Sequence, residues 1–164
     1  MSDRQFVPAP ELAELAFFVG AWEAEGTFHA TPFSAEKPIA MDIDVEVVHR
    51  GFWIRTGTAE RPTPDNPNPL TATYLWGYDP DTGWFSAEWF DSNGGRATQT
   101  STGWEGDRLL FVGQMAYGGY RFALRDTFTR HGDDAYLHLG EVDLGQGWIP
   151  VDEEQAHRRG APAP

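Results

Sequence analysis

Three side chains in predicted strands could carry acid–base chemistry: His138, Glu88 and Asp126. Each has apolar or aromatic neighbours along the chain. A carboxyl or imidazole group that faces an apolar cavity has a shifted pKa and can act as a general acid or base. The alternative is structural: His138 would be a hydrogen-bonded core residue, and the two acids would face solvent or pair with Arg121 or Arg125. These three residues are the catalytic candidates, and both interpretations stay open.

The familiar catalytic and metal-binding spacings are missing. The chain has no cysteine, which excludes disulfides, thiolate nucleophiles and zinc sites with cysteine ligands. The sequence has neither an H-E-x-x-H pair nor a Gly-x-Ser-x-Gly, Walker or dinucleotide motif. The five histidines are His29, His49, His131, His138 and His157. We therefore predict no metal site, although residues on neighbouring strands could still converge in space.

Aromatic side chains are the most numerous group in the predicted strands. They could line an apolar pocket, the usual composition of a small-molecule site, or they could simply fill the interior. Three polar residues among them could fix one polar end of a ligand. The predicted ligand-binding residues are Trp22, Phe28, Trp53, Tyr74, Trp76, Trp89, Phe111, Gln114, Phe122, Arg125 and His138.

The candidate site residues must lie on strands that have one inner and one outer face. Segments in which apolar and polar residues alternate predict such strands. In residues 41–47, Met, Ile and Val alternate with Asp and Glu, which is typical of a strand with one buried side. Similar segments, separated by turn signals, continue almost to the end of the chain. We predict an all-β fold: one closed antiparallel barrel of about ten strands. The predicted strands cover 21–30, 39–48, 52–60, 70–78, 84–91, 96–104, 108–115, 120–130, 135–142 and a last one from 148.

Other segments punctuate this barrel. A short helix is predicted over 11–19, with Leu12, Leu15, Ala16 and Val19 on one face, and it would close one barrel end. The proline-rich segment 61–69 is a loop that either borders a binding site at the barrel mouth or acts as a spacer. One domain is expected, with an arm over 1–10, the helix, a barrel over 21–158 and a disordered tail over 159–164.

Composition limits the partners. A chain of 164 residues suits one domain that buries roughly 70% of its unfolded surface. The net charge of −13, with Lys37 as the only lysine, argues against nucleic-acid and anionic-membrane partners. We find neither a signal-peptide run near the start nor an apolar stretch of about 20 residues. A cytoplasmic location is therefore expected.

Three short motifs occur in order along the chain: residues 20–26 (Gly-Ala-Trp-Glu-Ala-Glu-Gly), 77–80 (Gly-Tyr-Asp-Pro) and 145–150 (Gly-Gln-Gly-Trp-Ile-Pro), the last followed by Glu154 and Arg158. Over about 12–158 the chain thereby resembles the bacterial family catalogued as domain of unknown function fifteen-seventy-nine, a group of lipocalin-like (calycin) barrels. The resemblance implies a fold and no assigned activity. Ala24 stands where that family usually has glycine, and Ala156 where tyrosine is common.

A more distant resemblance is to the nitrobindins, ten-stranded barrels that hold haem through a histidine near the C-terminus. His157 lies near this C-terminus, but within the polar stretch 153–159. The nitrobindin start, a glycine-rich stretch running into Tyr-Pro-Thr, is replaced here by Gly-Thr-Phe-His-Ala-Thr-Pro at 26–32. We therefore expect neither haem nor another cofactor.

The expected function is binding of a small, largely apolar or amphipathic ligand inside the barrel, and binding is favoured over catalysis. One alternative is an isomerase, cyclase or hydratase type of enzyme that uses one cavity acid–base residue. Another is a ligand-free dimeric accessory protein with a filled interior. Because several strands are aromatic on both faces, a homodimer that covers outward rings is also expected.

Overall fold

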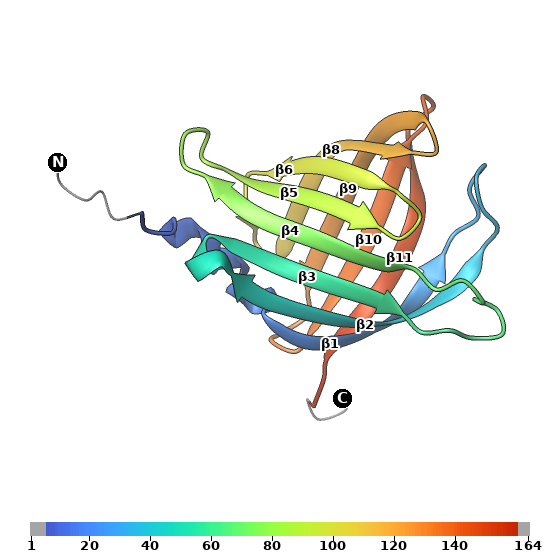
Figure 1. The fold of residues 1–164 in the computed structure, drawn as a ribbon, viewed down its shortest axis with the longest axis horizontal. Helices are drawn as coiled ribbons and strands as arrows, with labels where there is room; N and C mark the ends of the chain where they lie inside the picture. Colours follow the sequence, from blue (N-terminus) through green and yellow to red (C-terminus); the bar gives the residue numbers. More distant parts are fainter. Residues whose placement is uncertain (1–5, 161–164) are drawn as a thin grey trace.

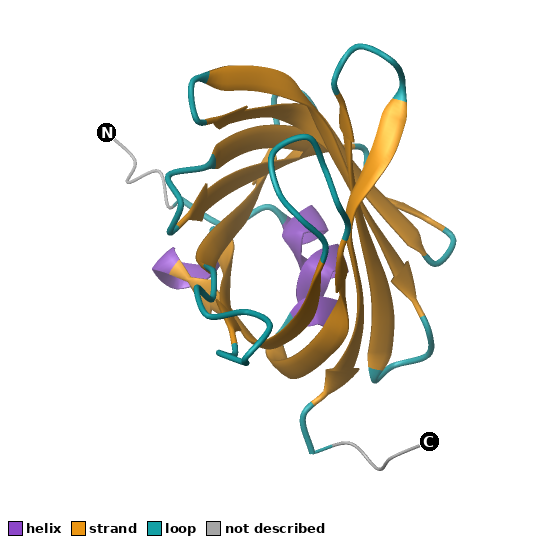
Figure 2. Ribbon diagram, turned by 90° about the vertical axis from the view of Figure 1, so that its right-hand side faces the viewer, coloured by secondary structure: helices purple, strands orange, loops and turns teal. Residues whose placement is uncertain are grey.

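A computed structural model describes residues 6–160, in which a single antiparallel sheet curls into a barrel (Figures 1 and 2). The ends of the predicted arm and tail, 1–5 and 161–164, lie outside the described residues. The strands are β1 (Gly20–Phe28), β2 (Lys37–Val48), β3 (Trp53–Glu60), β4 (Thr71–Asp79), β5 (Trp84–Asp91), β6 (Arg96–Ser101), β7 (Trp104–Glu105), β8 (Arg108–Tyr117), β9 (Tyr120–Arg130), β10 (Ala135–Asp143) and β11 (Trp148–Arg158).

The sheet closes into a barrel because the first and last strands of the chain pair with each other and β6 pairs with β8. Its strand order is β6-β5-β4-β3-β2-β1-β11-β10-β9-β8, and β6 also pairs with β8. The first and last strands meet with Trp22 opposite Arg158, while Thr98 lies opposite Gln114 at the β6–β8 seam. The predicted barrel of about ten strands is therefore confirmed, and the two-residue β7 is an addition at its edge.

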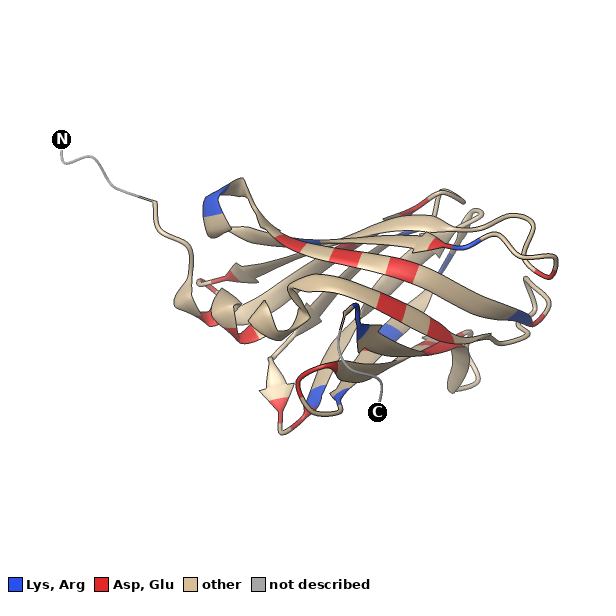
Figure 3. Ribbon diagram, turned by 90° about the horizontal axis from the view of Figure 1, so that it is seen from below, with Lys and Arg blue, Asp and Glu red and all other residues tan. Residues whose placement is uncertain are grey.

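Alternation along each strand separates the inside of the barrel from the outside. In β2, Ile39, Met41, Ile43 and Val45 are buried. The acidic residues between them, together with those of β1, follow one another along the outer surface (Figure 3). Val47 continues the apolar series but is 53% exposed.

The short helix predicted over 11–19 is present before β1 as η1 (Pro10–Phe18), and it is a 3-10 helix. A 3-10 helix has three residues per turn, so residues three apart share a face. The buried residues are accordingly Leu12, Leu15 and Phe18, while Ala16 is exposed. A further one-turn 3-10 helix, η2 (His49–Gly51), joins β2 to β3. Within 6–160, no helix is long and apolar enough to cross a membrane.

Hydrogen bonds from the barrel hold η1 against its end. Trp22 donates its indole N–H to the carbonyl of Phe18 at 2.8 Å. The guanidinium of Arg158 donates to the carbonyls of Phe17 and Val19, each at 2.9 Å. Thus a tryptophan and an arginine from the two motif-bearing ends of the barrel fix the helix that closes it.

A layer of rings fills the barrel behind η1. We call it the aromatic layer; it comprises Phe18, Trp22, Trp76, Phe111, Phe128 and Tyr136, all buried. The rings of Trp76 and Phe111 stack at 5.7 Å, and Phe18 meets Trp76 edge-on at 5.0 Å. The barrel is therefore solid at the helical end, and the loops β1–β2 and β3–β4 lie at the other end (Figure 1).

Candidate functional site

A cavity of about 570 Å³ occupies the barrel between the aromatic layer and the opposite end. Phe18, Trp76, Phe128 and Tyr136 form its floor, and residues of the two end loops line its mouth. Its size is within the range of pockets that hold small molecules. Most of the wall is apolar, from residues such as Phe28, Ile39, Met41, Leu124 and Val142.

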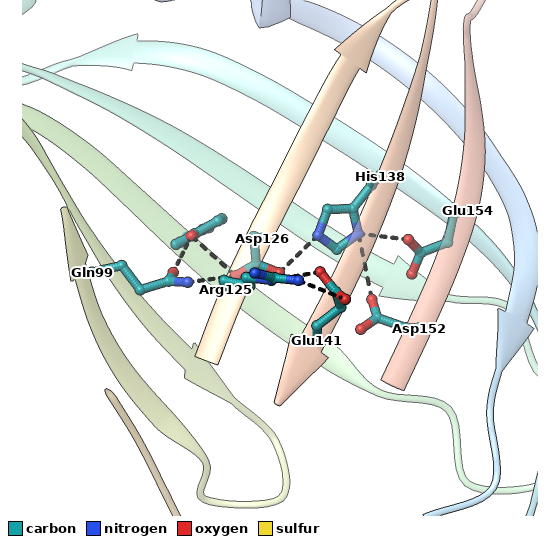
Figure 4. A network of polar contacts seen from close by, with 8 residues as sticks. Gln99, Arg125, Asp126, His138, Glu141, Asp152 and Glu154 are labelled. Atoms are coloured by element: carbon teal, nitrogen blue, oxygen red, sulfur yellow. Dashed lines mark hydrogen bonds and ion pairs between the residues drawn. The ribbon is translucent and has the colours of Figure 1, made fainter. Parts of the chain in front are cut away.

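The polar part of the wall centres on His138 of β10 (Figure 4). Its Nδ1 lies 2.6 Å from Oε2 of Glu154 and 3.4 Å from Oδ2 of Asp152, both on β11. Its Nε2 lies 2.8 Å from Oδ1 of Asp126 on β9. One imidazole is therefore surrounded by three carboxyl groups from the two neighbouring strands.

Hydrogen bonds continue from Asp126 across the barrel interior. Its Oδ2 accepts a hydrogen bond from Nε2 of Gln99 on β6 at 2.7 Å, and Gln99 accepts one from the hydroxyl of Tyr74 on β4. Tyr74, Gln99, Asp126 and Glu154 are all buried. We call these four residues, with His138 and Asp152, the polar network; it joins strands that are far apart in the sequence.

Gly140 makes room for this network. It lies opposite Asp126 in β9 and opposite Asp152 in β11, one inward position beyond His138. A Cβ atom at Gly140 would come within 2.1 Å of Oδ1 of Asp152 and 3.3 Å of Oδ1 of Asp126. A glycine within a strand often marks such a close approach. The missing side chain lets both acids lean toward the histidine.

Burial and mutual charge shift the pKa values of the network. Burial alone would lower the pKa of His138, but the charges of Glu154 and Asp152 and the hydrogen bonds to Asp126 and Glu154 raise it well above its usual value. Burial, followed by the charge of Glu154, raises the pKa of Asp152 well above its usual value. Burial and the charge of Asp126 do the same for the pKa of Tyr74. The acids therefore favour a protonated His138, while burial disfavours ionisation of Asp152 and Tyr74.

The predicted ligand-binding residues separate into three groups. Those on the cavity wall are Phe28, Tyr74, Trp76, Trp89, Phe122 and His138. Trp22 and Phe111 are fully buried in the aromatic layer. Trp53, Gln114 and Arg125 face outward, because their neighbours Ile54, Met115 and Asp126 face inward. Arg125 is bound on the outside by Glu141, at 2.6 and 3.0 Å, so neither it nor Gln114 reaches a ligand in the cavity.

The acid–base candidates also separate. His138 and Asp126 line the cavity, and Asp126 pairs with His138 rather than with an arginine. Glu88 lies on the outer face and accepts a hydrogen bond from the hydroxyl of Thr98 at 2.8 Å. His157 is exposed on the outer face of β11, so it does not reach the interior.

Sequence reasoning missed Asp152, Glu154 and Gln99. Residues 152–155 are all polar, which gives the appearance of an exposed segment, and the alternation of β11 becomes clear only once Ala156 is known to face inward. The donor atoms of His138, Asp152 and Glu154 all lie within 4.8 Å of one another, so these residues could hold a metal ion. The sequence feature that could have indicated these residues is Gly140, a glycine within a predicted strand two residues after His138.

A second polar cluster lies at the cavity mouth and fixes the proline-rich loop. Oε2 of Glu60 accepts hydrogen bonds from Nζ of Lys37 at 2.9 Å, Nδ2 of Asn66 at 2.8 Å and the backbone N–H of Leu70 at 2.8 Å. Burial raises the pKa of Glu60, but these three hydrogen bonds and the charge of Lys37 outweigh it, so the pKa is lower than usual. Residues 65–68 of the loop line the cavity.

Comparisons with known proteins identify relatives of this barrel. The family model described as "Protein of unknown function (DUF1579)" matches residues 7–133. The crystal structure of Rv2717c from M. tuberculosis is similar, with a TM-score of 0.71 and 17% identity, covering 93% of this chain and 99% of that chain. The structure of the S-type phycobiliprotein lyase CPES from Guillardia theta has a TM-score of 0.56 and 14% identity, covering 94% and 100%. No curated protein matches the sequence.

We expect Gly140→Ala to destabilise the protein by about 1–3 kcal/mol, because the added methyl group collides with Asp152. Gly57→Ala is the matched control: this strand glycine also lacks a positive φ, and its Cβ would have only Asp44 O nearby, at 3.9 Å. Its stability should change by about 0.5 kcal/mol or less. Urea unfolding measures both. Equal effects would contradict the close approach at Gly140.

Glu60→Gln should reduce stability at neutral pH by about 1–3 kcal/mol, since a buried charge with three donors is lost. A depressed carboxyl pKa stabilises the fold above the unfolded value of 4.5, and this contribution is lost as the pH falls through the folded value. The difference between wild type and variant should therefore shrink in acid. Urea unfolding at several pH values tests this, with Glu88→Gln on the outer face of β5 as control. A difference independent of pH would count against it.

Proposed function

The chain belongs to the DUF1579 family, whose description assigns no function, and from that premise we propose that it binds a small, largely apolar ligand inside its barrel. The observation that carries this proposal is the cavity of about 570 Å³, which has mostly apolar walls and the polar network on its inner wall. A closed barrel of this size can either fill its interior or keep room for one ligand. Here the aromatic layer fills only one end.

The wall composition supports a ligand with an apolar body and one polar end. Phe28, Trp89 and Phe122 contribute aromatic rings to the cavity wall. Ile39 and Met41 contribute aliphatic side chains. Burying such surface contributes roughly 25 cal/mol per Å² of apolar area. Polar groups are costly to bury unless they are hydrogen-bonded, so the polar end would lie at the polar network.

Thr56 adds independent support from another wall of the cavity. It is 8% exposed, lines the cavity, and its hydroxyl lacks a hydrogen-bond partner among residues 6–160. It lies opposite Tyr74 in the β3–β4 register, and thus at the level of the polar network. Buried hydroxyls are normally satisfied. A polar group of the ligand, or a water beside it, would supply the partner.

The similarity to Rv2717c and to the phycobiliprotein lyase concerns the fold, so the proposal rests on the cavity and not on those proteins. Acid–base catalysis is a second candidate function, favoured by the interior position of His138 and Asp126 beside the cavity. Both ring nitrogens of His138 already contact carboxylates, which leaves Asp152 as the group most open to a substrate. A cytoplasmic location and a homodimer stay predictions.

We expect the neutral, apolar fluorophore N-phenyl-1-naphthylamine to bind saturably, with one molecule per barrel. Thr58→Trp places an indole inside the cavity and should weaken binding about tenfold or more. Fluorescence titration measures the affinity. Native mass spectrometry of freshly purified protein should in addition show a retained small molecule.

Thr98→Trp is the control, because Thr98 is exposed on the outer face of β6. It should bind the fluorophore as the wild type does. Equal loss in both variants would place the fluorophore outside the barrel. Failure of the wild type to bind it, together with no retained molecule, would overturn the proposal. If the retained molecule exchanges a carbon-bound hydrogen for deuterium when it is incubated with the protein in heavy water, this result would favour catalysis.

A further inference from the structure

His138, Asp152 and Glu154 bring one imidazole and two carboxyl groups to one point of the cavity wall. Nδ1 of His138 is 2.6 Å from Oε2 of Glu154 and 3.4 Å from Oδ2 of Asp152. A metal ion with ligand bonds of about 2.0–2.2 Å holds its donor atoms roughly 3–3.5 Å apart. Small side-chain rotations therefore suffice to place these three donors around an ion.

The other ring nitrogen of His138 has the partner that metal-bound histidines require. Nε2 lies 2.8 Å from Oδ1 of Asp126, whose second oxygen is already hydrogen-bonded to Gln99. An ionised carboxylate only accepts hydrogen bonds, so Nε2 carries a proton. A histidine that binds a metal almost always donates its far N–H to a carboxylate, carbonyl or water, which fixes the tautomer and raises the basicity of the ligating nitrogen.

A metal ion at this point would take the place of a proton on His138. A ring protonated on both nitrogens donates to Glu154 through Nδ1 and to Asp126 through Nε2, and an ion bound to Nδ1 would replace the first of these protons. Glu154 is 5% exposed, and a buried carboxylate is costly unless it is paired. A divalent ion among the three donors would replace the Nδ1 proton and pair with both carboxyl groups.

Two observations outside the three donors point to an occupant. Gly140 leaves the space that Asp152 uses to approach His138, since any Cβ there would collide with its carboxyl group. The unpartnered hydroxyl of Thr56, buried on another wall of the same cavity, lies at the level of the network. Three protein donors leave further coordination positions open toward this cavity, where a water or ligand atom can bind the ion.

We propose that the barrel binds one divalent first-row transition-metal ion through Nδ1 of His138 and the carboxylates of Asp152 and Glu154. Asp126 is a positioning residue that holds the ring. Imidazole and carboxylate donors suit Zn²⁺, Mn²⁺ and Fe²⁺. The open positions would take the polar end of the proposed ligand. The metal site is nevertheless tested with the ion alone. A failure to bind the ion would leave the ligand proposal unaffected, and a failure to bind the fluorophore would leave the metal proposal unaffected.

Isothermal titration of the chelator-treated full chain with Zn²⁺ should show one ion per chain and a raised melting temperature. Glu154→Gln should weaken binding about tenfold or more, and Asp126→Asn by about 10–100-fold. Glu153→Gln is the matched control, because Glu153 is the adjacent residue on β11 and faces outward. Its affinity should equal that of the wild type.

A measurement on the wild type keeps the test independent of variant folding. Among the five histidines, Zn²⁺ should perturb the ring ¹⁵N resonances of His138 first, and at Nδ1, while Nε2 keeps its proton. Absence of saturable Zn²⁺ binding, or equal weakening by Glu153→Gln and Glu154→Gln, would overturn the proposal. Binding of dodecylammonium at His138 in the absence of Zn²⁺ binding would also overturn the proposal, because the site would then take an organic cation and not a metal ion.

Discussion

The absence of a side chain at Gly140 is the constraint on which the interior of this barrel depends. Antiparallel pairing sets Asp126 on one side of this residue and Asp152 on the other, and both acids use the empty position to reach His138. Any larger residue would push at least Asp152 away. The ring would then lose its contact with Asp152 and keep those with Glu154 and Asp126. A single backbone position therefore decides whether the third carboxyl group can join the histidine.

The sequence predicted the architecture because alternation is a local signal. In β2 the buried and acidic positions could be read directly, and closure followed from the number of such segments. It did not predict which way strands with polar or aromatic residues on both faces would point. Arg125 and Asp126 are adjacent, so one had to face outward, and only the barrel shows that it is Arg125. The register of the β10–β11 pairing also shifts between Gly140 and Glu141. Opposing residues at the end of β10 therefore cannot be assigned by counting along the sequence.

The two ends of the barrel differ in structure: one end is closed by packed side chains, and the other carries the mouth of the cavity. At the η1 end, Trp22 and Arg158 fasten the helix by hydrogen bonds to its backbone, and the rings behind it leave no room for a ligand. At the other end, Glu60 holds the proline-rich loop from within, and the only lysine is used for that purpose. The loop thus has a defined position although it has few backbone donors. Its place at the mouth could not be predicted from its composition, because a spacer would have the same prolines.

The acidity of the protein has different consequences outside and inside the barrel. Outside, Asp and Glu along β1 and β2 are solvated or paired with arginines such as Arg61 and Arg159. Inside, Asp126, Asp152 and Glu154 share one histidine, and the surrounding apolar wall strengthens every charge interaction because little water screens it. Long-range steering by a surface of charge −13 favours cations over anions at the mouth. The proposed cation would use this acidic wall and would in turn give the cavity an attachment point for an uncharged or anionic ligand group.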